Sequence, residues 1–186
     1  ILKVVDINGR VLEVKEQESQ QIISPQNAYI TTDMLTGVMK PGGTGSHLGE
    51  VVGRPSAGKT GTTQEYRDAW FVGYTPELSC AVWVGYDTPS KSVGIPGGRI
   101  AGPIWARFMK GVLDQLPQRE FSIPEGIKKI KIDLDNGLIA TENCPRTIEA
   151  AFLTGSEPHD ICYEHQSPRE WWNWGGLWGH SEGTPE

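Results

Sequence analysis

The chain has 186 residues, 37% of them hydrophobic, which is compatible with one folded domain or a domain with a small appendage. Acidic residues (23) outnumber Lys and Arg (17), and the basic residues form no long run, which argues against a nucleic-acid surface. No apolar run is long enough to cross a bilayer and there is no signal-peptide pattern, so this sequence, which begins with Ile1, is interpreted as a piece of a longer protein.

The first segments predict a β-hairpin followed by a helix. Strand-forming runs flank Asn8-Gly9, a pair favoured in two-residue turns, so residues 1–14 are expected to form a hairpin. Ser24 is a favourable N-cap and Pro25 suits the first helical position. The helix that begins there is predicted to stop at Pro41.

Strands are expected in the middle of the chain. The Gly-rich stretch 42–50 is predicted to be a mobile loop that precedes them. The strands are predicted at residues 59–63, 68–75 and 79–86, and the last two should pair antiparallel. The second strand carries Trp70, Val72 and Tyr74 on one face, and this face is expected to fill the core.

The remainder predicts a helix, a β appendage and a tail. The helix should begin near Pro103 and end before Pro117, and its packing face is predicted to comprise Trp105, Phe108, Met109 and Val112. Asn136-Gly137 predicts a second hairpin. We therefore expect an α+β fold with an antiparallel sheet of about five strands. The expected divisions are residues 1–117, an appendage at 118–165 and a flexible Trp- and Gly-rich tail at 166–186.

Lys59 belongs to three overlapping motifs that serve different chemistry. Residues 53–60 fit G-x-x-x-x-G-K-[ST], the phosphate-binding loop of nucleotide hydrolases. Ser56 and Lys59 fit S-x-x-K, the nucleophile motif of serine acyltransferases, and residues 59–62 read K-T-G-T, which such enzymes carry on a strand. The local structure that each motif requires separates the three interpretations.

Local propensity disfavours the first two motifs. A phosphate-binding loop needs a helix after its lysine, and residues 60–63, Thr-Gly-Thr-Thr, are a poor first turn. Asp87 after an apolar strand imitates the metal-binding aspartate of nucleotide hydrolases, but this arrangement is common. S-x-x-K needs a helix to place both residues on one face, whereas a strand points Ser56 and Lys59 to opposite faces.

A strand at K-T-G-T predicts a peptide-binding edge. Strand alternation places Thr60 and Thr62 on one face, where their hydroxyls suit a substrate carboxylate, and Lys59 on the other. Gly61 would let a peptide lie close to the backbone, and an edge strand offers free amides and carbonyls. The triplet alone is equally compatible with an edge strand that has no binding role.

The surrounding sequence resembles the transpeptidase domain of class A penicillin-binding proteins. The resemblance rests on AGKTGTT, DAWFVGYTP and AVWVGYD in this order, after ISPQNAYITTDMLTGVMKPGGTG and before GRIAGPIWARFM. It covers residues 1–117 and implies the fold of serine β-lactamases and penicillin-binding transpeptidases, here incomplete.

The resemblance implies catalytic roles on the K-T-G-T strand. Lys59 would place a positive charge near the serine of S-x-N and the substrate carboxylate, and would assist proton movement. The hydroxyls of Thr60 and Thr62 would bind that carboxylate. The Thr62 backbone N–H would be one donor of the oxyanion hole.

Neighbouring residues receive lesser roles from the same resemblance. Gly61 and Thr63 are expected to contact the peptide, and the Gly58 backbone is a weaker candidate. Asp68 and Trp70 match the family but are interpreted as structural.

The resemblance implies a serine D-Ala-D-Ala transpeptidase or carboxypeptidase that needs no cofactor. It would cross-link peptidoglycan stem peptides and bind β-lactams at the extracytoplasmic face of a bacterial membrane, in a parent protein that also carries a glycosyltransferase domain and an anchor. Apart from Ser56, however, the sequence holds no S-x-x-K, and it holds no S-x-N. We therefore expect this chain to supply one wall of the site and to be inactive alone, with the nucleophile on a missing part of the same protein. A nucleotide hydrolase and a non-catalytic peptide-binding module are the alternatives.

Cysteines and histidines near the C-terminus allow three interpretations. Cys144, His159, Cys162 and His165 could bind zinc, but the spacing C-x14-H-x2-C-x2-H lacks the paired knuckle of common zinc sites. An extracytoplasmic protein can instead form a Cys144–Cys162 disulfide, which is favoured here, or keep free thiols. No metal site is predicted, and Cys80 is expected to be a small buried hydrophobe.

Overall fold

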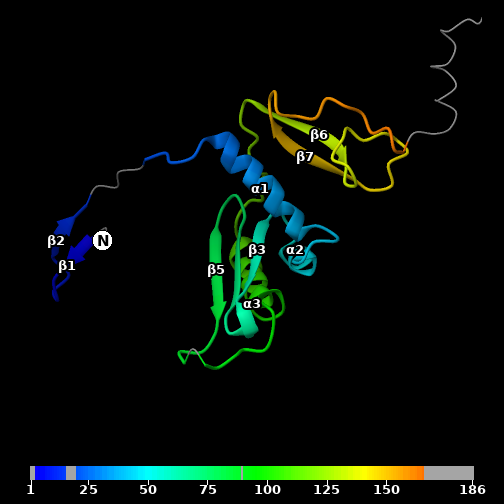
Figure 1. Ribbon diagram of the computed structural model, residues 1–186. Helices are drawn as coiled ribbons and strands as arrows, with labels where there is room; N and C mark the ends of the chain where they lie inside the picture. The colour runs from blue at the N-terminus through cyan, green and yellow to red at the C-terminus, as the bar shows by residue number, and fades with distance from the viewer. Residues whose placement is uncertain (1–2, 16–19, 89, 166–186) are drawn as a thin grey trace, which may run out of the picture.

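A computed structural model describes residues 3–15, 20–88 and 90–165, so the predicted tail lies outside the described residues (Figure 1). The elements are β1 (Lys3–Val5), β2 (Val11–Val14), α1 (Pro25–Met39), α2 (Ser46–Val52), β3 (Ala57–Thr62), the 3₁₀ turn η1 (Gln64–Tyr66), β4 (Ala69–Tyr74), β5 (Ser79–Val84), α3 (Gly97–Leu113), β6 (Ile127–Asp133) and β7 (Thr147–Leu153). No helix among these residues is long and apolar enough to cross a membrane.

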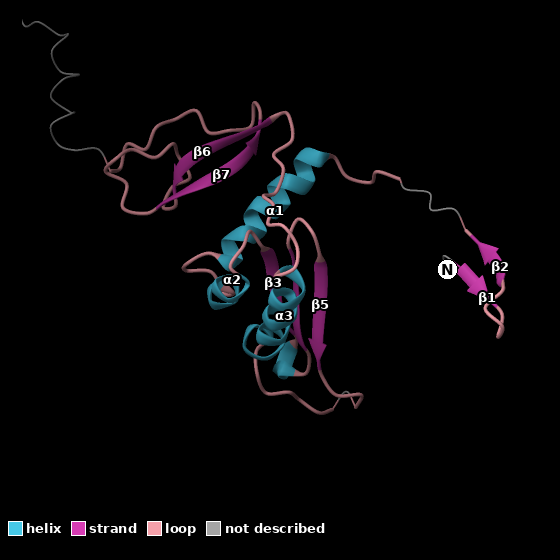
Figure 2. Ribbon diagram, turned by 180° about the vertical axis from the view of Figure 1, so that it is seen from behind, coloured by secondary structure: helices cyan, strands magenta, loops and turns pink. Residues whose placement is uncertain are grey.

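The predicted α+β class is confirmed, but the single sheet of about five strands is wrong. The strands form a three-stranded antiparallel sheet, β3-β4-β5, and two separate two-stranded sheets, β1-β2 and β6-β7 (Figure 2). The period-two pattern that identifies strands does not specify which edges pair, and so the sequence could not establish the number of sheets.

The start of the first helix follows the predicted local rules, and the helix ends at Met39, just before Pro41. The Ser24 side chain accepts a hydrogen bond from the Asn27 amide (3.2 Å) and Pro25 occupies the first turn. The preceding β1-β2 hairpin is also confirmed, and Gly9 in its turn has φ +81°. These elements depend on local chemistry, which a sequence displays directly.

The loop predicted at residues 42–50 is wrong, because α2 begins at Ser46. Leu48 and Val52 are buried on one side of this short helix, and their packing outweighs the poor helix propensity of its glycine. Gly49 faces α1 so closely that a Cβ would lie 2.4 Å from the Met39 carbonyl oxygen. Gly53 (φ 67°) ends the helix in the left-handed conformation.

The core lies between α3 and the face of β4 opposite to the predicted one. Phe71 packs against Trp105 with ring centroids 4.8 Å apart, and both side chains are fully buried. Trp105 approaches because Gly73 has no side chain: a Cβ there would lie 2.6 Å from the indole. Trp70 and Val72 are exposed instead. The alternation of side chains between the two faces of β4 is as predicted, but Trp70 lies on the exposed face and not on the core face.

The third helix begins earlier than predicted, at Gly97, so Pro103 lies inside it. Its buried face is Ala101, Trp105, Ala106, Met109 and Leu113, whereas the predicted members Phe108 and Val112 are exposed. Two glycines start the helix because its first turn lies directly against the sheet. A Cβ on Gly97 would lie 2.3 Å from the carbonyl oxygens of both Gly61 and Trp70.

The C-terminal sheet packs against α1, which lies between this sheet and the β3-β4-β5 sheet (Figures 1 and 2). The Asn136-Gly137 turn forms, with the Gly137 amide donating to the Asp133 carbonyl (2.8 Å). The second strand of the predicted hairpin is wrong: Ile139 makes only isolated bridges, and β6 pairs along its length with β7.

Candidate functional site

The structure places Lys59 within an edge strand, which decides between the three motifs. Lys59 pairs with Val72 of β4, and the strand continues to Thr62 before the turn η1. The helix that a phosphate-binding loop requires is therefore replaced by strand, and the nucleotide-hydrolase interpretation is wrong. Ser56 is buried before the strand while Lys59 is exposed, so S-x-x-K here lacks the shared helical face of a nucleophile motif.

The Lys59 ammonium lies beside Thr60. Lys59 Nζ donates to the Thr60 carbonyl oxygen (3.1 Å) and to Thr60 Oγ1 (3.4 Å). The backbone alternates as predicted, but the flexible side chain of Lys59 returns over the strand edge towards its neighbour. A positive charge and a hydroxyl therefore meet at an exposed strand edge, an arrangement suited to a carboxylate.

Thr62 is held by the first turn of α3. Its Oγ1 accepts a hydrogen bond from the Gly97 amide (3.2 Å). Because this contact uses the oxygen as acceptor, the Thr62 hydroxyl proton stays available for another acceptor. On the same side of the strand, a Cβ on Gly98 would lie 3.0 Å from Thr60 Cγ2. The N-terminus of α3 therefore supports both threonines and brings its favourable dipole towards any anion bound to them.

Gly61 has a packing role on the opposite face of β3. A Cβ there would lie 2.9 Å from Trp70 Cβ on the neighbouring strand. Gly58 is buried in the same strand, and a Cβ on it would lie 3.0 Å from the Phe71 ring. The glycines thus let β3 lie close to the aromatic residues of β4.

The turn after β3 is braced by Asp68. Thr63 Oγ1 donates to Asp68 Oδ2 (3.3 Å) and accepts from the Asp68 amide (2.8 Å), and the Trp83 indole donates to Asp68 Oδ1 (2.9 Å). Glu65 and Tyr66 adopt positive φ angles of 57° and 53°, which non-glycine residues rarely do. An open hollow at this end of β3 is lined by Thr62, Thr63, Gln64, Glu65, Arg67 and Asp68.

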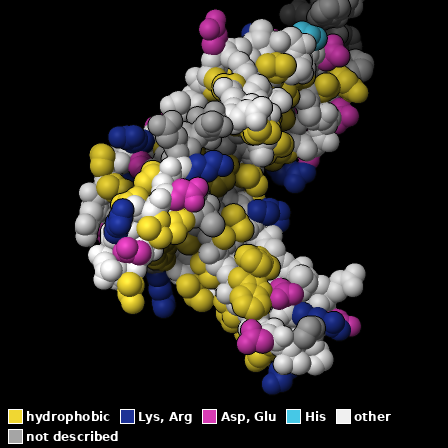
Figure 3. Space-filling model, turned by 90° about the vertical axis from the view of Figure 1, so that its left-hand side faces the viewer, with side chains coloured by type: hydrophobic (Ala, Val, Ile, Leu, Met, Phe, Trp, Pro, Cys, Tyr) yellow, Lys and Arg dark blue, Asp and Glu magenta, His cyan; other side chains and the backbone are white. Residues whose placement is uncertain are grey.

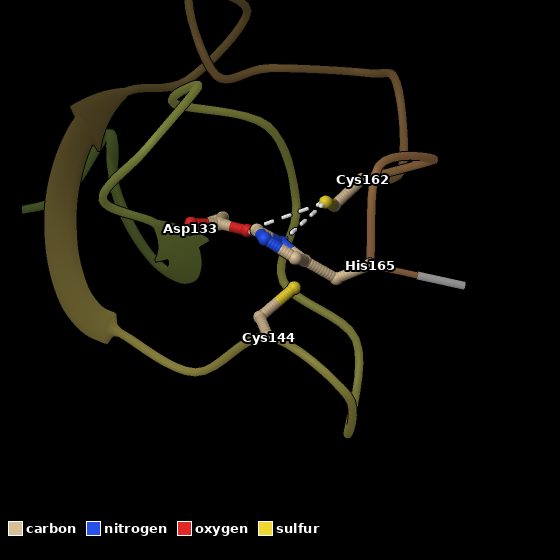
Figure 4. Close-up of side chains that lie close together, drawn as sticks. All are labelled: Asp133, Cys144, Cys162 and His165. Atoms are coloured by element: carbon tan, nitrogen blue, oxygen red, sulfur yellow. Dashed lines mark hydrogen bonds and ion pairs between the residues drawn. The ribbon is translucent and has the colours of Figure 1, made fainter. Parts of the chain in front are cut away.

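A second group of reactive side chains lies at the far end of β6. Asp133, Cys144, Cys162 and His165 converge, each with a ligand atom within 4.8 Å of the others (Figure 4). The predicted Cys144–Cys162 disulfide is not formed, since all three cysteines are free. Asp133 joins the group, whereas His159 of the predicted set does not. Cys80, predicted to be a small buried hydrophobe, lies in β5 and is only partly buried.

Hydrogen bonds shift the acidities in this group. The Asp135 amide, with further hydrogen bonds from the group, holds the pKa of Asp133 far below its usual range despite burial. Hydrogen bonding to Asp133 raises the pKa of His165. The carboxylate is therefore ionised while fully buried.

Sequence reasoning missed Gly97, Gly98 and Asp133. The two glycines precede the helix start predicted near Pro103, although Pro-Gly-Gly before an apolar helical pattern signals a helix start packed closely on another element. Asp133 gave no such signal, because its proximity to Cys162 and His165 arises only from the fold of residues 133–165.

Two protein families match successive parts of this chain. Residues 3–110 match the penicillin binding protein transpeptidase domain, and residues 123–167 match the C-terminal domain of penicillin-binding protein 1A. The two matched ranges do not overlap.

Known proteins of the same kind are similar along most of the chain. Penicillin-binding protein 1A of Aquifex aeolicus is 38% identical over 164 residues, which is 87% of this chain and 22% of that protein. Penicillin-binding protein 2D of Bacillus subtilis is 31% identical over 169 residues, covering 88% of this chain and 24% of that protein. The chain thus spans less than a quarter of each of these relatives.

A solved structure supports the same assignment. Penicillin-binding protein 1A from Haemophilus influenzae superposes with a TM-score of 0.71 at 25% identity, over 87% of this chain and 30% of that one. Family match, relatives and fold agree, and the chain belongs to the class A penicillin-binding protein family.

Proposed function

We propose that β3 forms one wall of a peptidoglycan D,D-transpeptidase site that acts through a serine acyl-enzyme. The observation that carries the proposal is the placement of the Lys59 ammonium 3.4 Å from Thr60 Oγ1 on an exposed edge strand, with Thr62 Oγ1 supported by the Gly97 amide. A peptide ending in D-Ala-D-Ala has a terminal carboxylate that these groups would bind. β-Lactams, which carry a comparable carboxylate, would enter the same site.

Each residue has a distinct role in this proposal. Thr60 and Thr62 donate hydrogen bonds to the carboxylate, and Lys59 balances its charge and assists proton movement. The Thr62 amide is one oxyanion donor, and removal of such a donor typically costs about 3–4 kcal/mol of transition-state stabilisation. Gly61 leaves room for the extended peptide, and Thr63 contributes at the end of the strand.

The serine nucleophile belongs to a part of the protein outside these 186 residues. This rests on the sequence, which offers only the buried Ser56 as an S-x-x-K serine and no S-x-N motif. We assign residues 1–117 to the transpeptidase domain, 118–165 to a separate appendage and 166–186 to a tail; the matches at 3–110 and 123–167 support this division. The whole protein would work at the outer face of the cell membrane and would carry a glycosyltransferase domain as well.

Acylation of the longer protein by labelled penicillin tests the assignment. Thr60→Val and Thr62→Val each remove one hydroxyl and should slow acylation by about ten- to a hundredfold, the value of one charge-assisted hydrogen bond. Thr31→Val is the matched control, since Thr31 is exposed on α1 and, among the described residues, its hydroxyl bonds only to the Asn27 carbonyl.

Two results would contradict the proposal. Equal acylation rates in the wild type and both strand variants would remove the carboxylate role of β3. Binding of a D-Ala-D-Ala peptide by the longer protein without any acylation would indicate a non-catalytic peptide-binding module.

A further inference from the structure

We propose that Asp133, Cys144, Cys162 and His165 form a structural zinc site that holds the C-terminal sheet together. The four side chains come from the end of β6, the loop before β7 and the segment after β7, and they point toward one another (Figure 4). The site is separate from the K-T-G-T strand and needs no part of the proposed catalytic function.

The observed distances approach those of a tetrahedral metal site. Zn–S bonds of about 2.3 Å and Zn–N or Zn–O bonds of about 2.0–2.2 Å place ligand atoms about 3.3–3.8 Å apart. Cys162 Sγ lies 3.3 Å from Asp133 Oδ2 and 3.4 Å from His165 Nδ1. The third distance among these three residues, from Asp133 Oδ2 to His165 Nδ1, is 2.6 Å, and it would have to lengthen on metal binding.

Outer contacts fit sulfur atoms that act as thiolate ligands. Asn136 Nδ2 donates to Cys162 Sγ (3.3 Å), and the Thr141 amide donates to Cys144 Sγ (3.2 Å). Donors aimed at ligand sulfurs orient and stabilise the thiolates. A disulfide would use only two of the four converging side chains and would leave Asp133 buried beside it.

Residues 118–165 have too small a hydrophobic core to be stable by packing alone, which favours stabilisation by a bound metal. Among the described residues from 118 to 165, the buried hydrophobic residues are only Ala151 and Cys162. A unit with so little hydrophobic core usually depends on a metal or a disulfide.

The donor set selects the metal. Two thiolates, an imidazole and a carboxylate are borderline-soft ligands, which favour zinc over magnesium or calcium. Thiolates and carboxylate contribute three negative charges, so Zn²⁺ leaves a net charge of −1. Four protein ligands complete a tetrahedron and leave no open position, which is typical of a structural rather than a catalytic site.

Cobalt substitution in the full 186-residue chain tests the site directly. The chain, reduced and freed of metal by chelator, should bind one equivalent of Co²⁺ with the intense visible bands of tetrahedral cobalt and a thiolate-to-cobalt charge-transfer band, and Zn²⁺ should displace the cobalt. Cys162→Ser should weaken binding by more than about a hundredfold, beyond the loss caused by outer contacts alone. Cys80→Ser and His159→Asn are the controls: each replaces a cysteine or a histidine that lies outside the cluster, and both variants should bind cobalt like the wild type.

A second measurement does not depend on any variant. Chelator should lower the melting temperature of the zinc-loaded wild type, because metal bound only to the folded state stabilises it. Absence of the charge-transfer band in the reduced wild type would overturn the proposal, as would cobalt binding that survives Cys162→Ser. A Cys144–Cys162 disulfide found by mass spectrometry in chain purified with zinc would overturn it as well.

Discussion

At the scale of single residues, the position of Gly97 controls how α3 supports the threonines of β3. Its amide bonds to Thr62 Oγ1, and its missing side chain leaves room for the carbonyl oxygens of Gly61 and Trp70. The same glycine therefore sets the distance between the helix and the candidate site.

Substitution of this glycine should separate the helix from the strand. In Gly97→Ala the new Cβ would lie 2.3 Å from two backbone oxygens, so the first turn of α3 must shift, at a cost of about 1–3 kcal/mol of unfolding free energy. Denaturant unfolding measures this loss. Gly111→Ala is the control on the same helix, because nothing lies within 4 Å of its Cβ; alanine there should stabilise the helix by about 0.5–1 kcal/mol. Equal effects of the two substitutions would contradict the close approach.

At the scale of elements, local signals predicted more than long-range ones. The Ser24 cap, the Asn8-Gly9 turn and the strand at K-T-G-T were readable because each depends on residues adjacent in the chain. The face of β4 that is buried was not readable, because it depends on Trp105, which lies more than thirty residues away and fits over Gly73. The start of α3 was missed for a different reason: Pro-Gly-Gly is a local signal, but its glycines follow tertiary packing and are poor helix formers by propensity.

The candidate site likewise has a part that the sequence predicted from a local motif and a part that depends on long-range contacts. Lys59, Thr60 and Thr62 were identified from a motif whose strand is confirmed, while their roles remain predictions. The support from Gly97 depends on contacts across thirty-five residues, which no local pattern contains.

The pair formed by Glu157 and Lys128 should give the β6-β7 unit a measurable acid sensitivity. Hydrogen bonds from Lys128 and from backbone amides to the Glu157 carboxylate lower the pKa of Glu157 from 4.5 to about 2. A lowered pKa stabilises the fold above pH 4.5, and this contribution disappears as the pH falls towards 2.

Glu157→Gln should therefore reduce stability at neutral pH and flatten its dependence between pH 4.5 and 2. Thermal melts across this range provide the measurement. Glu149→Gln is the control, since Glu149 is an exposed residue of β7 whose ion pair with Lys129 is long, at 3.6 Å. Parallel pH profiles for the wild type and Glu157→Gln would show that the carboxylate makes no such contribution.

At the scale of the whole molecule, Asp33 links α1 to the C-terminal sheet. Its carboxylate accepts the Ala151 amide of β7 (3.0 Å) and pairs with Lys129 of β6 (3.4 Å). The two parts that match different families therefore share a partly buried polar contact.

Removal of this contact should loosen the C-terminal sheet first. Asp33→Ala leaves the Ala151 amide without its acceptor, at a cost of about 1–3 kcal/mol. Hydrogen exchange should accelerate at Ala151 more than in β4, and Asp87→Ala, in an exposed loop, should change neither. Uniform acceleration in both sheets would mean that Asp33 stabilises the molecule without linking its parts.

The hydrophobic surface of the sheet bears on whether this chain can act alone. Figure 3 views the molecule from the side of β1, β2 and β5 and shows hydrophobic side chains gathered in the middle of that face. Trp70, Val72 and Trp83 are exposed, and Trp70 and Trp83 lie 6.3 Å apart between ring centroids. An apolar sheet face of this kind is suited to a covering element.

We therefore expect the isolated chain to resist acylation by β-lactams. In the proposed function Lys59 and the two threonines bind a carboxylate, but these groups cannot replace a nucleophile. Ser56 is 6% exposed and precedes β3, whereas the Lys59 side chain is exposed and turned towards Thr60, so the pair cannot exchange a proton as S-x-x-K does on a helix. Intact-mass spectrometry after incubation with a β-lactam should show no adduct on the chain, while the longer protein, which is proposed to carry the nucleophile, should gain one per molecule. A stoichiometric adduct on Ser56 would show instead that this chain holds a complete site.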